Sequence, residues 1–442
     1  PELYEEIKEL VREKRWEPEG SMWVESDTNV VSGESLVRQF LVGKRFFKNE
    51  FGVDNRIMWL PDVFGYSGAL PQIIRKSDID YFMTTKISWN EFDKFPFDTF
   101  MWRGIDGTEV LSHFIPTQSC DDKGFMTTYN GYLSPDQVIG GWRRYSNKDL
   151  NKNVLFSYGW GDGGGGPTRD MLEHGRRMEK GIPGCPTLKQ EFARDFFDRL
   201  ASEVKDSDRL PVWAGELYLE FHRGTLTAQS RNKKYNRKSE YLYQDAESLG
   251  VIAELLASKE YPSDKLLAGW KLILLNQFHD IIPGSSIAAV YEDSKEQYEL
   301  VAKEGSEMVN ESEFAVASLI NADGRIIVVF NTLGFARSSV VIADTPEKRE
   351  FHIEDMDGNV MPSQITYDGK LAFFAADVPA KGYKTFRIVD SAVESADSVK
   401  SGNNEFSNDY YTVKFDGNMN IASYYDKSAD RCVSKENDVL GR

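Results

Sequence analysis

The hydrophobic pattern of this chain changes twice along its length, and each change predicts a different kind of fold. Over residues 1–205, short apolar runs alternate with amphipathic helical segments, which predicts parallel strands joined by helices. Three long helical segments then follow in series, at 241–258, 265–278 and 286–319, and predict a bundle. From Arg325 the apolar residues recur with a period of two, which predicts an all-β domain.

The chain is therefore expected to form three domains of different class. They are an α/β domain at 1–205, a three-helix domain at 206–320 and a β domain at 321–442. A length of 442 residues agrees with two or three domains. The more detailed expectations are a helix at 1–16, strands at 22–27, 81–86 and 154–158, a hairpin at 100–114, helices at 135–147 and 168–180, and a loop at 391–404.

Charge and cysteine content narrow the class of partner and the compartment. The formal net charge of −17 argues against nucleic acid or an anionic membrane as a partner and suits a neutral substrate. The three cysteines lie far apart and form no CxxC, which favours a reducing compartment, the cytoplasm. The sequence shows no apolar run of transmembrane length and no signal peptide.

A first candidate catalytic group is Asp62. Trp59 and Leu60 read as the end of a buried strand, Pro61 stops the strand, and Asp62 follows at its carboxyl end, where α/β folds gather catalytic groups. Aromatic residues flank it, so Asp62 reads as a carboxylate on an aromatic floor. The alternative, of about equal weight, is an aspartate that caps the following helix.

A second candidate is Asp162, in a glycine-rich loop that also follows a predicted strand. Four consecutive glycines cost backbone entropy, so the loop is expected to move or to approach a ligand closely. It lacks the Lys-Ser/Thr ending of a P-loop and is not GxGxxG. A carboxyl presented to a neutral substrate fits it, while a plain flexible turn keeps about a third of the weight.

A third candidate group is His279 with Asp280, at the end of a predicted helix that Pro283 and Gly284 break. This histidine could be a metal ligand or an acid/base, although a histidine at a helix end is more often a partner of the helix dipole. Asp62 and Asp162 could together serve a retaining glycosidase, which needs two carboxyl groups about 5–5.5 Å apart. Spacing along the chain does not show that the two meet.

Taken together, these motifs resemble the α-mannosidases of glycoside hydrolase family 38, in their cytosolic and bacterial branch. The order of the motifs and of the domains agrees with that family, which implies an α/β barrel of the (β/α)7 type, a three-helix bundle and β-sandwich domains. The motifs that carry the resemblance are WLPDVFGYSGALPQI at 59–73, YGWGDGGGGPT at 158–168, GELYLEFHRGT at 215–225 and NQFHDIIPGSS at 276–286.

The resemblance also implies roles for single residues. Asp62 would be both the nucleophile and a zinc ligand, His279 a second zinc ligand, and Asp162 the general acid/base. Lys86 would hold Asp62 ionised. The substrate would be an α-mannoside oligosaccharide, bound by Trp59, Phe64, Tyr66, Lys86, Trp89, His222, Arg223 and Asp280.

One departure from the family pattern concerns the metal. The family has a His-x-Asp pair near its N-terminus that supplies two more zinc ligands, and no His-x-Asp occurs in this chain. We therefore expect those ligands upstream of Pro1, a barrel without its first strand, and a chain that is a piece of a longer protein whose last domain is the start of a β-sandwich.

The leading hypothesis is a zinc-dependent retaining exo-α-mannosidase that forms a covalent glycosyl-enzyme on Asp62. A non-catalytic carbohydrate-binding or scaffold protein on the same fold is the alternative. A metal-dependent deacetylase or phosphatase is a more distant third, because it would leave the glycine-rich loop of Asp162 unexplained. The linkage that is cleaved and the oligomeric state, a homo-oligomer included, stay open.

Overall fold

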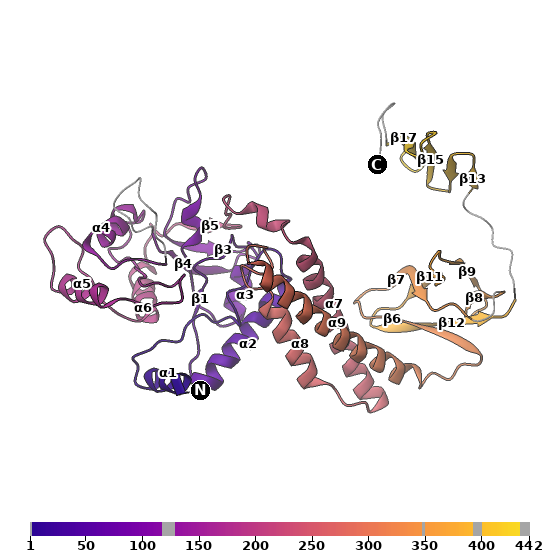
Figure 1. The fold of residues 1–442 in the computed structure, drawn as a ribbon, viewed down its shortest axis with the longest axis horizontal. Helices are drawn as coiled ribbons and strands as arrows, with labels where there is room; N and C mark the ends of the chain where they lie inside the picture. The colour runs from indigo at the N-terminus through magenta and orange to yellow at the C-terminus, as the bar shows by residue number, and fades with distance from the viewer. Residues whose placement is uncertain (1, 117–128, 347–349, 392–399, 434–442) are drawn as a thin grey trace. The chain divides into compact units, whose positions relative to one another are not determined.

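The computed structural model describes residues 2–116, 129–346, 350–391 and 400–433. The chain divides into two compact units, Pro1–Ser318 and Leu319–Arg442 (Figure 1). Among the described residues, no helix combines the length and apolar character that a membrane span requires. The predicted boundary between residues 205 and 206 falls inside the first unit, and the limits of the three predicted domains stay predictions.

The first unit contains a five-stranded sheet of order β1-β2-β4-β3-β5. Strands β1, β2 and β4 are parallel, β3 and β4 form an antiparallel hairpin, and β5 is parallel to β3. The bounds are β1 Ile57–Trp59, β2 Tyr81–Thr84, β3 Thr99–Arg103, β4 Glu109–Phe114 and β5 Val212–Ala214. The helices around this sheet are α1 Glu2–Arg12, α2 Gly33–Phe51, α3 Leu70–Lys76, α4 Pro135–Arg144, α5 Arg169–Glu179 and α6 Ala193–Val204.

Alternation of side chains along β1 gives the sheet two apolar faces. Ile57 and Trp59 pack in a cluster with Phe197 of α6, while Met58 belongs to a second cluster that includes Phe40 of α2. Because both faces are covered, the strands are short continuous apolar runs, as buried parallel strands are. Because the two faces of the sheet are apolar, polar side chains can gather at the ends of its strands.

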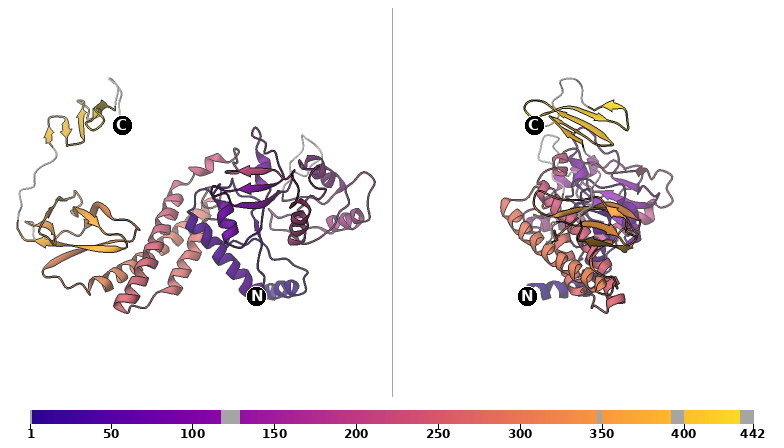
Figure 2. Two further views of the ribbon diagram at one scale, coloured as in Figure 1. Left: turned by 180° about the vertical axis from the view of Figure 1, so that it is seen from behind. Right: turned by 90° about the vertical axis from the view of Figure 1, so that its right-hand side faces the viewer.

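Three helices complete the first unit: α7 Ser230–Ala257, α8 Ser263–Leu275 and α9 Ala288–Ala317. They run side by side (Figure 1 and Figure 2) around a core that contains Tyr243 and Trp270. Gly269 lies so close to Tyr243 that a Cβ there would come within 2.0 Å of the phenolic oxygen. The glycine therefore allows α7 and α8 to approach closely.

The second unit is all β. The sheets β10-β11-β7 and β6-β12-β8-β9 share one core, in which the rings of Phe373 and Phe386 lie 5.2 Å apart. A further antiparallel sheet has the order β13-β14-β15-β16-β17. The bounds are β6 Arg325–Asn331, β7 Arg337–Ala343, β8 His352–Asp355, β9 Val360–Met361, β10 Ser363–Ile365, β11 Leu371–Val378, β12 Gly382–Val389, β13 Lys400–Gly402, β14 Glu405–Ser407, β15 Tyr411–Phe415, β16 Ile421–Asp426 and β17 Arg431–Cys432.

The multidomain mixture of α/β, helical and β parts agrees with the expected fold class, and the closed barrel stays a prediction. Two predicted strands are wrong. The segment 22–27 makes only an isolated bridge, between Ser26 and Phe278, and 154–158 makes only one between Tyr158 and Gly131. The predicted loop 391–404 ends in β13, which pairs with β14, and its residues 392–399 lie outside the described part.

Candidate active site

Asp62 lies directly beyond the carboxyl end of β1, as its motif predicts. Thr85 donates a hydrogen bond of 2.7 Å to the carbonyl of Pro61, and Leu60 donates its amide to the carbonyl of Met83. These bonds continue the pairing of β1 with β2 and hold the start of the loop. Asp62 does not cap α3, because that helix begins after Ala69 and has no side-chain cap.

Lys86 and His279 face the Asp62 carboxylate. The Lys86 ammonium binds Oδ1, and Nε2 of His279 lies 3.6 Å from Oδ2. Burial pushes the pKa of Asp62 upward, but His279 and the charge of Lys86 together hold this pKa below its usual value. The carboxylate is therefore ionised and fixed in place.

Lys86 is 5% exposed, and aromatic rings lie next to its ammonium group. It begins the 3-10 turn Lys86–Trp89, and its Nζ lies 4.5 Å from the centre of the Trp89 ring and 5.1 Å from that of Phe64. Cation–π attraction adds to the ion pair at such distances. Phe64 in turn packs edge-on against His222, with centroids 4.7 Å apart.

His279 is held from behind by the chain at Glu25. The amide of His279 donates to the carbonyl of Glu25, and its Nδ1 lies 3.0 Å from the same oxygen. A carbonyl only accepts, so Nδ1 carries a proton and Nε2 is directed to Asp62. Helix α8 ends at Leu275, so His279 lies in the following turn and is not a partner of the last turn of α8.

Carboxylates set the charge state of this imidazole. Burial lowers the pKa of His279, but Asp62 and Glu25 outweigh it and raise this pKa above its usual value. Glu25 Oε2 lies 3.8 Å from Nδ1, and Asp280 Oδ2 lies 3.8 Å from Nε2. Burial also raises the pKa of Glu25 to about 6.

The pair of Asp62 and His279 suits a metal ion. With Nδ1 protonated, a neutral His279 would turn its Nε2 lone pair toward Asp62 Oδ2 at 3.6 Å. A proton or a metal ion between these two acceptors would satisfy both. Two ligands of one zinc ion, each about 2.0–2.2 Å from it, lie at a similar separation. No group of three or more His, Cys, Asp or Glu residues suited to a metal occurs in the part of the chain that the structure describes.

A cavity of about 600 Å³ opens over Asp62. It also takes in Asp162, whose amide donates a 2.8 Å hydrogen bond to Oδ1 of Asn130. The loop that bears Asp162 is closed by hydrogen bonds between Trp160 and Gly165 or Gly166, and Asp162 itself is exposed. The lining residues are Asp62, Phe64, Lys86, Trp89, Tyr129, Asn130, Asp162, Phe221, His222, Gly224, Thr225, Ala228, Asp280, Pro283, Gly284 and Ser285.

Three residues that the resemblance assigned to the pocket do not line it. Tyr66 is 1% exposed, because its hydroxyl turns inward to the carbonyl of Leu60 and to Thr84. Trp59 packs on the α6 face of the sheet, where strand alternation places it. Arg223 begins a 3-10 turn beside the cavity without lining it. The placement of Tyr66 and Trp59 in the pocket is therefore corrected, and sugar binding by Arg223 stays a prediction.

Some contacts of the site carried no signal in the sequence. Tyr129 and Asn130 lie in irregular chain, and Pro283 and Gly284 suggested only the end of a helix. Tyr129 lines the same cavity as Asp62, and burial together with that carboxylate raises the pKa of its hydroxyl. The carboxylates of the segment 22–27 could have marked Glu25 as a site residue. Its contact with His279 joins segments far apart in the sequence, so no local pattern predicts it.

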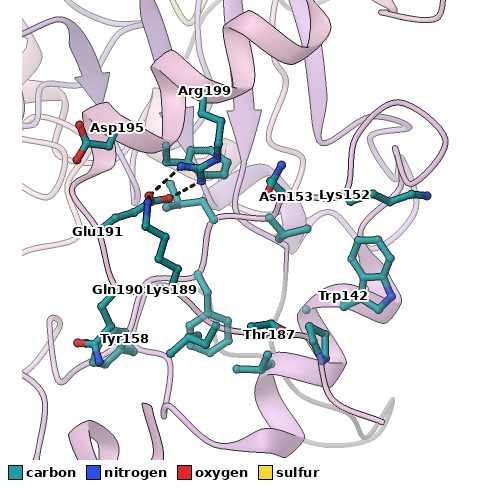
Figure 3. Close-up of a pocket in the computed structure, with 18 of the residues that line it drawn as sticks. Trp142, Lys152, Asn153, Tyr158, Thr187, Lys189, Gln190, Glu191, Asp195 and Arg199 are labelled. Carbon is teal, nitrogen blue, oxygen red and sulfur yellow. Dashed lines mark hydrogen bonds and ion pairs between the residues drawn. The ribbon is translucent and has the colours of Figure 1, made fainter. Parts of the chain in front are cut away.

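A second cavity, of about 690 Å³, lies beside α6 (Figure 3). Its carboxylate Glu191 is paired with Arg199 at 2.8 Å and with Lys189 at 2.7 Å, and these partners lower the pKa of Glu191. None of the predicted site residues lines it. The cavity over Asp62 is lined by Asp62, Asp162 and Asp280 and is therefore the stronger candidate.

Comparisons with known proteins agree with the motifs. The N-terminal domain model of glycosyl hydrolases family 38 matches residues 1–216, and the α-mannosidase middle domain model matches residues 220–315. Alpha-mannosidase G of Dictyostelium discoideum is 34% identical over 100% of this chain, and alpha-mannosidase 2C1 of Homo sapiens is 39% identical over 78% of it. The chain spans 42% and 32% of the length of these two relatives.

A solved structure supports the fold. The α-mannosidase from Enterococcus faecalis V583 superposes with a TM-score of 0.72 at 18% identity, and the match covers 98% of this chain and 54% of that one. This similarity agrees with the mixed architecture of sheet, helices and β units. On the two domain matches and the four motifs, the chain belongs to glycosyl hydrolase family 38.

Proposed function

We propose that the protein is a zinc-dependent, retaining exo-α-mannosidase that removes terminal α-linked mannose from oligosaccharides. One observation carries the proposal: the largely buried Asp62 carboxylate is held ionised by Lys86 and His279 in a cavity that also contains Asp162. The names of the relatives, both α-mannosidases, support the choice of sugar.

In this mechanism Asp62 is the nucleophile. One carboxylate oxygen attacks the anomeric carbon while the bond to the leaving oxygen breaks, and Asp162 donates its proton to that oxygen. A water molecule then attacks the glycosyl-enzyme, Asp162 takes its proton, and the bond to Asp62 breaks. Lys86 binds Oδ1 and so keeps the carboxylate oriented between the two steps.

The two carboxyl groups differ in their surroundings as the two roles require. Asp62 is largely buried, and burial by itself would raise its pKa. His279 and Lys86 outweigh this effect and lower the pKa below its usual value. Asp162 is exposed on a loop of glycines, where the backbone can adjust as the proton is given and taken back. This asymmetry supports Asp62 as the nucleophile and Asp162 as the acid/base.

The sugar would rest on aromatic side chains and be held by polar ones. Phe64, Trp89 and Phe221 line the cavity with His222 and Asp280, a mixture of apolar faces and hydrogen-bonding groups that suits a pyranose. Burial and the charge of Lys86 lower the pKa of His222, so this imidazole is neutral and can donate or accept a hydrogen bond.

Asp62 and His279 would hold the zinc ion. The metal would bind hydroxyls of the terminal sugar and withdraw electron density from them. A zinc site needs further ligands beyond this pair. We also propose a cytoplasmic location, which free Cys185 supports.

Turnover of an aryl α-mannoside by the full-length protein tests the proposal. We expect Asp62→Ala to abolish mannose release and Asp54→Ala, which removes an exposed carboxylate paired with Lys44, to leave it unchanged. Near-normal turnover of Asp62→Ala would contradict the assignment. Sugar binding without turnover and without zinc in the wild-type protein would favour the carbohydrate-binding alternative.

The role of Asp162 has its own test. An activated aryl leaving group needs no proton, so Asp162→Ala should keep more of its first-step rate on a dinitrophenyl mannoside than on an alkyl mannoside. An equal loss on both substrates would mean that Asp162 does not act as the acid.

A further inference from the structure

A cluster of buried polar side chains lies behind His279, and the proposed mechanism does not use it. Its members come from α2, from α7 and from the turn after α8, and each is at most 1% exposed. Buried polar groups are costly unless every one finds a partner, so a cluster of this size needs a reason. The members are Ser35, Gln39, Asn236, Glu240 and Gln277.

Gln277 is the centre of this cluster. Its Nε2 lies 3.0 Å from Ser35 Oγ, 2.9 Å from Asn236 Oδ1 and 3.3 Å from Glu240 Oε1. Its Oε1 accepts a hydrogen bond of 3.2 Å from Gln39. One side chain in the turn after α8 is thus bonded to both α2 and α7.

Glu240 completes the connection between the two helices. Its Oε1 accepts hydrogen bonds from the amide of Ser32 at 2.9 Å and from the hydroxyl of Ser35 at 2.7 Å. Its Oε2 accepts one from Arg237 at 2.6 Å, and Arg237 also donates to the carbonyl of Val30. The buried carboxylate therefore has partners on both oxygens, and it holds the start of α2 against α7.

The backbone of Gln277 leads directly to the site. Its carbonyl accepts from the amide of Asp27, Phe278 forms a bridge with Ser26, and His279 donates to Glu25. The residues 25–27 and 277–279 are thus paired antiparallel, and the register of this pairing decides where the imidazole points. The cluster holds one of the two paired segments in register through a side chain, because Gln277 cannot shift along the chain without losing its bonds to α2 and α7.

We propose that Gln277 and Glu240 are positioning residues, which set the register of the turn that bears His279 and so aim its Nε2 at Asp62. The proposal rests on the proposed function only where turnover and zinc are concerned. Polar networks of this kind specify one arrangement among several compact ones, where an apolar core of the same volume would tolerate slippage.

The test compares Gln277→Leu with Ser294→Ala in the full-length protein. Ser294 is also a buried polar residue of the helices. Its 2.9 Å hydrogen bond joins Asn232 of α7 to α9 and does not involve α2 or the turn. We expect hydrogen exchange of the backbone in 276–282 to be about tenfold faster in Gln277→Leu. Zinc should be retained about tenfold less tightly in a competition with a chelator. Ser294→Ala should lower Tm without either change.

A conservative pair of variants separates hydrogen bonding from charge. Glu240→Gln keeps an oxygen that can accept from Ser32 and Ser35 and should retain the slow exchange of 276–282, whereas Glu240→Leu should lose it. If Gln277→Leu does not fold, Ser35→Ala, which removes a single hydroxyl, carries the same comparison.

The proposal is overturned if the exchange of 276–282 and the zinc affinity follow Tm alone, so that Gln277→Leu and Ser294→Ala fall on one line. It is also overturned if Glu240→Leu exchanges as slowly as Glu240→Gln. A wild-type protein without mannosidase activity would refute the proposed function, and the exchange measurement would still decide the positioning role.

Discussion

Replacing Lys86 by methionine should destabilise the first unit in a way that depends on pH. Methionine keeps the apolar stem that lies against Trp89 and Phe64 but removes the ammonium that binds Asp62. Removing one partner of a buried ion pair costs about 3–5 kcal/mol. His279 remains 3.6 Å from the carboxylate, so we expect the lower end of that range, about 3 kcal/mol.

The pH dependence follows from the pKa of Asp62. In the wild-type protein this folded-state pKa is lowered, so the stability it contributes is present above the unfolded value of about 3.9 and is lost as pH falls through the folded value. In Lys86→Met, burial without the ammonium raises the folded pKa. As pH falls, the Asp62 carboxyl of the variant is therefore protonated before that of the wild-type protein. Below the folded pKa of the variant, the difference in unfolding free energy between the two proteins decreases by about 1.4 kcal/mol for each pH unit.

Urea unfolding followed by tryptophan fluorescence measures this difference, in metal-free buffer at pH 7 and pH 4.5. In the 442-residue chain, all nine tryptophans precede residue 319, so the signal of this chain reports on the first unit alone. Lys44→Met is the control, because Lys44 pairs with an exposed Asp54 at 3.0 Å and should cost no more than about 1 kcal/mol. An equal destabilisation by Lys86→Met at both pH values would refute the electrostatic argument and leave a packing effect.

Three further predictions concern packing, protonation and the metal. Gly43→Ala places a Cβ 2.3 Å from the backbone of Met22 and should lower the free energy of unfolding by about 1–3 kcal/mol. The control is Gly33→Ala in the same helix, whose Cβ meets nothing within 4 Å and should not destabilise the protein. Thermal unfolding separates the two variants. Burial lowers the pKa of His113 to about 3, so the unfolded state takes up this proton at a higher pH than the folded state. The free energy of unfolding should therefore fall by up to about 1.4 kcal/mol per pH unit as pH drops below about 6.5. In urea titrations, His113→Gln should lack that pH dependence. Treating the full-length protein with a chelator should abolish mannoside turnover, and added zinc should restore it; unchanged turnover in metal-free protein would contradict the zinc proposal.

Local sequence signals found most elements of the first unit but not all of their limits. Helix α7 begins at Ser230, well before the predicted 241. The buried side chains of its first turns are polar, among them Asn232, Asn236 and Glu240, so no apolar periodicity marks them. The same polar face contributes to the cluster behind His279. The hydrophobic pattern of the sequence therefore predicts neither the first turns of α7 nor this cluster.

The predicted strands at 22–27 and 154–158 failed for a related reason. A strand exists only with a hydrogen-bonded neighbour, and apolar composition does not supply one. Residues 22–27 find only short pairings: the amide of Trp23 donates to the carbonyl of Gln39, and one bridge at Ser26 joins 25–27 to 277–279. Pairing depends on what another part of the chain offers, and a single segment does not show this.

What the sequence by itself determined is local: Pro61 ends a strand and leaves Asp62 at its tip, and glycines around Asp162 make a loop. Which of these groups meet was decided by the tertiary structure. His279 takes its orientation from Glu25, 254 residues away in the chain, and Tyr66 is buried while Phe64, two residues before it, lines the cavity. Neighbours in the site come from separate elements, because side-chain surroundings follow from packing between distant segments and from no pattern within any one of them.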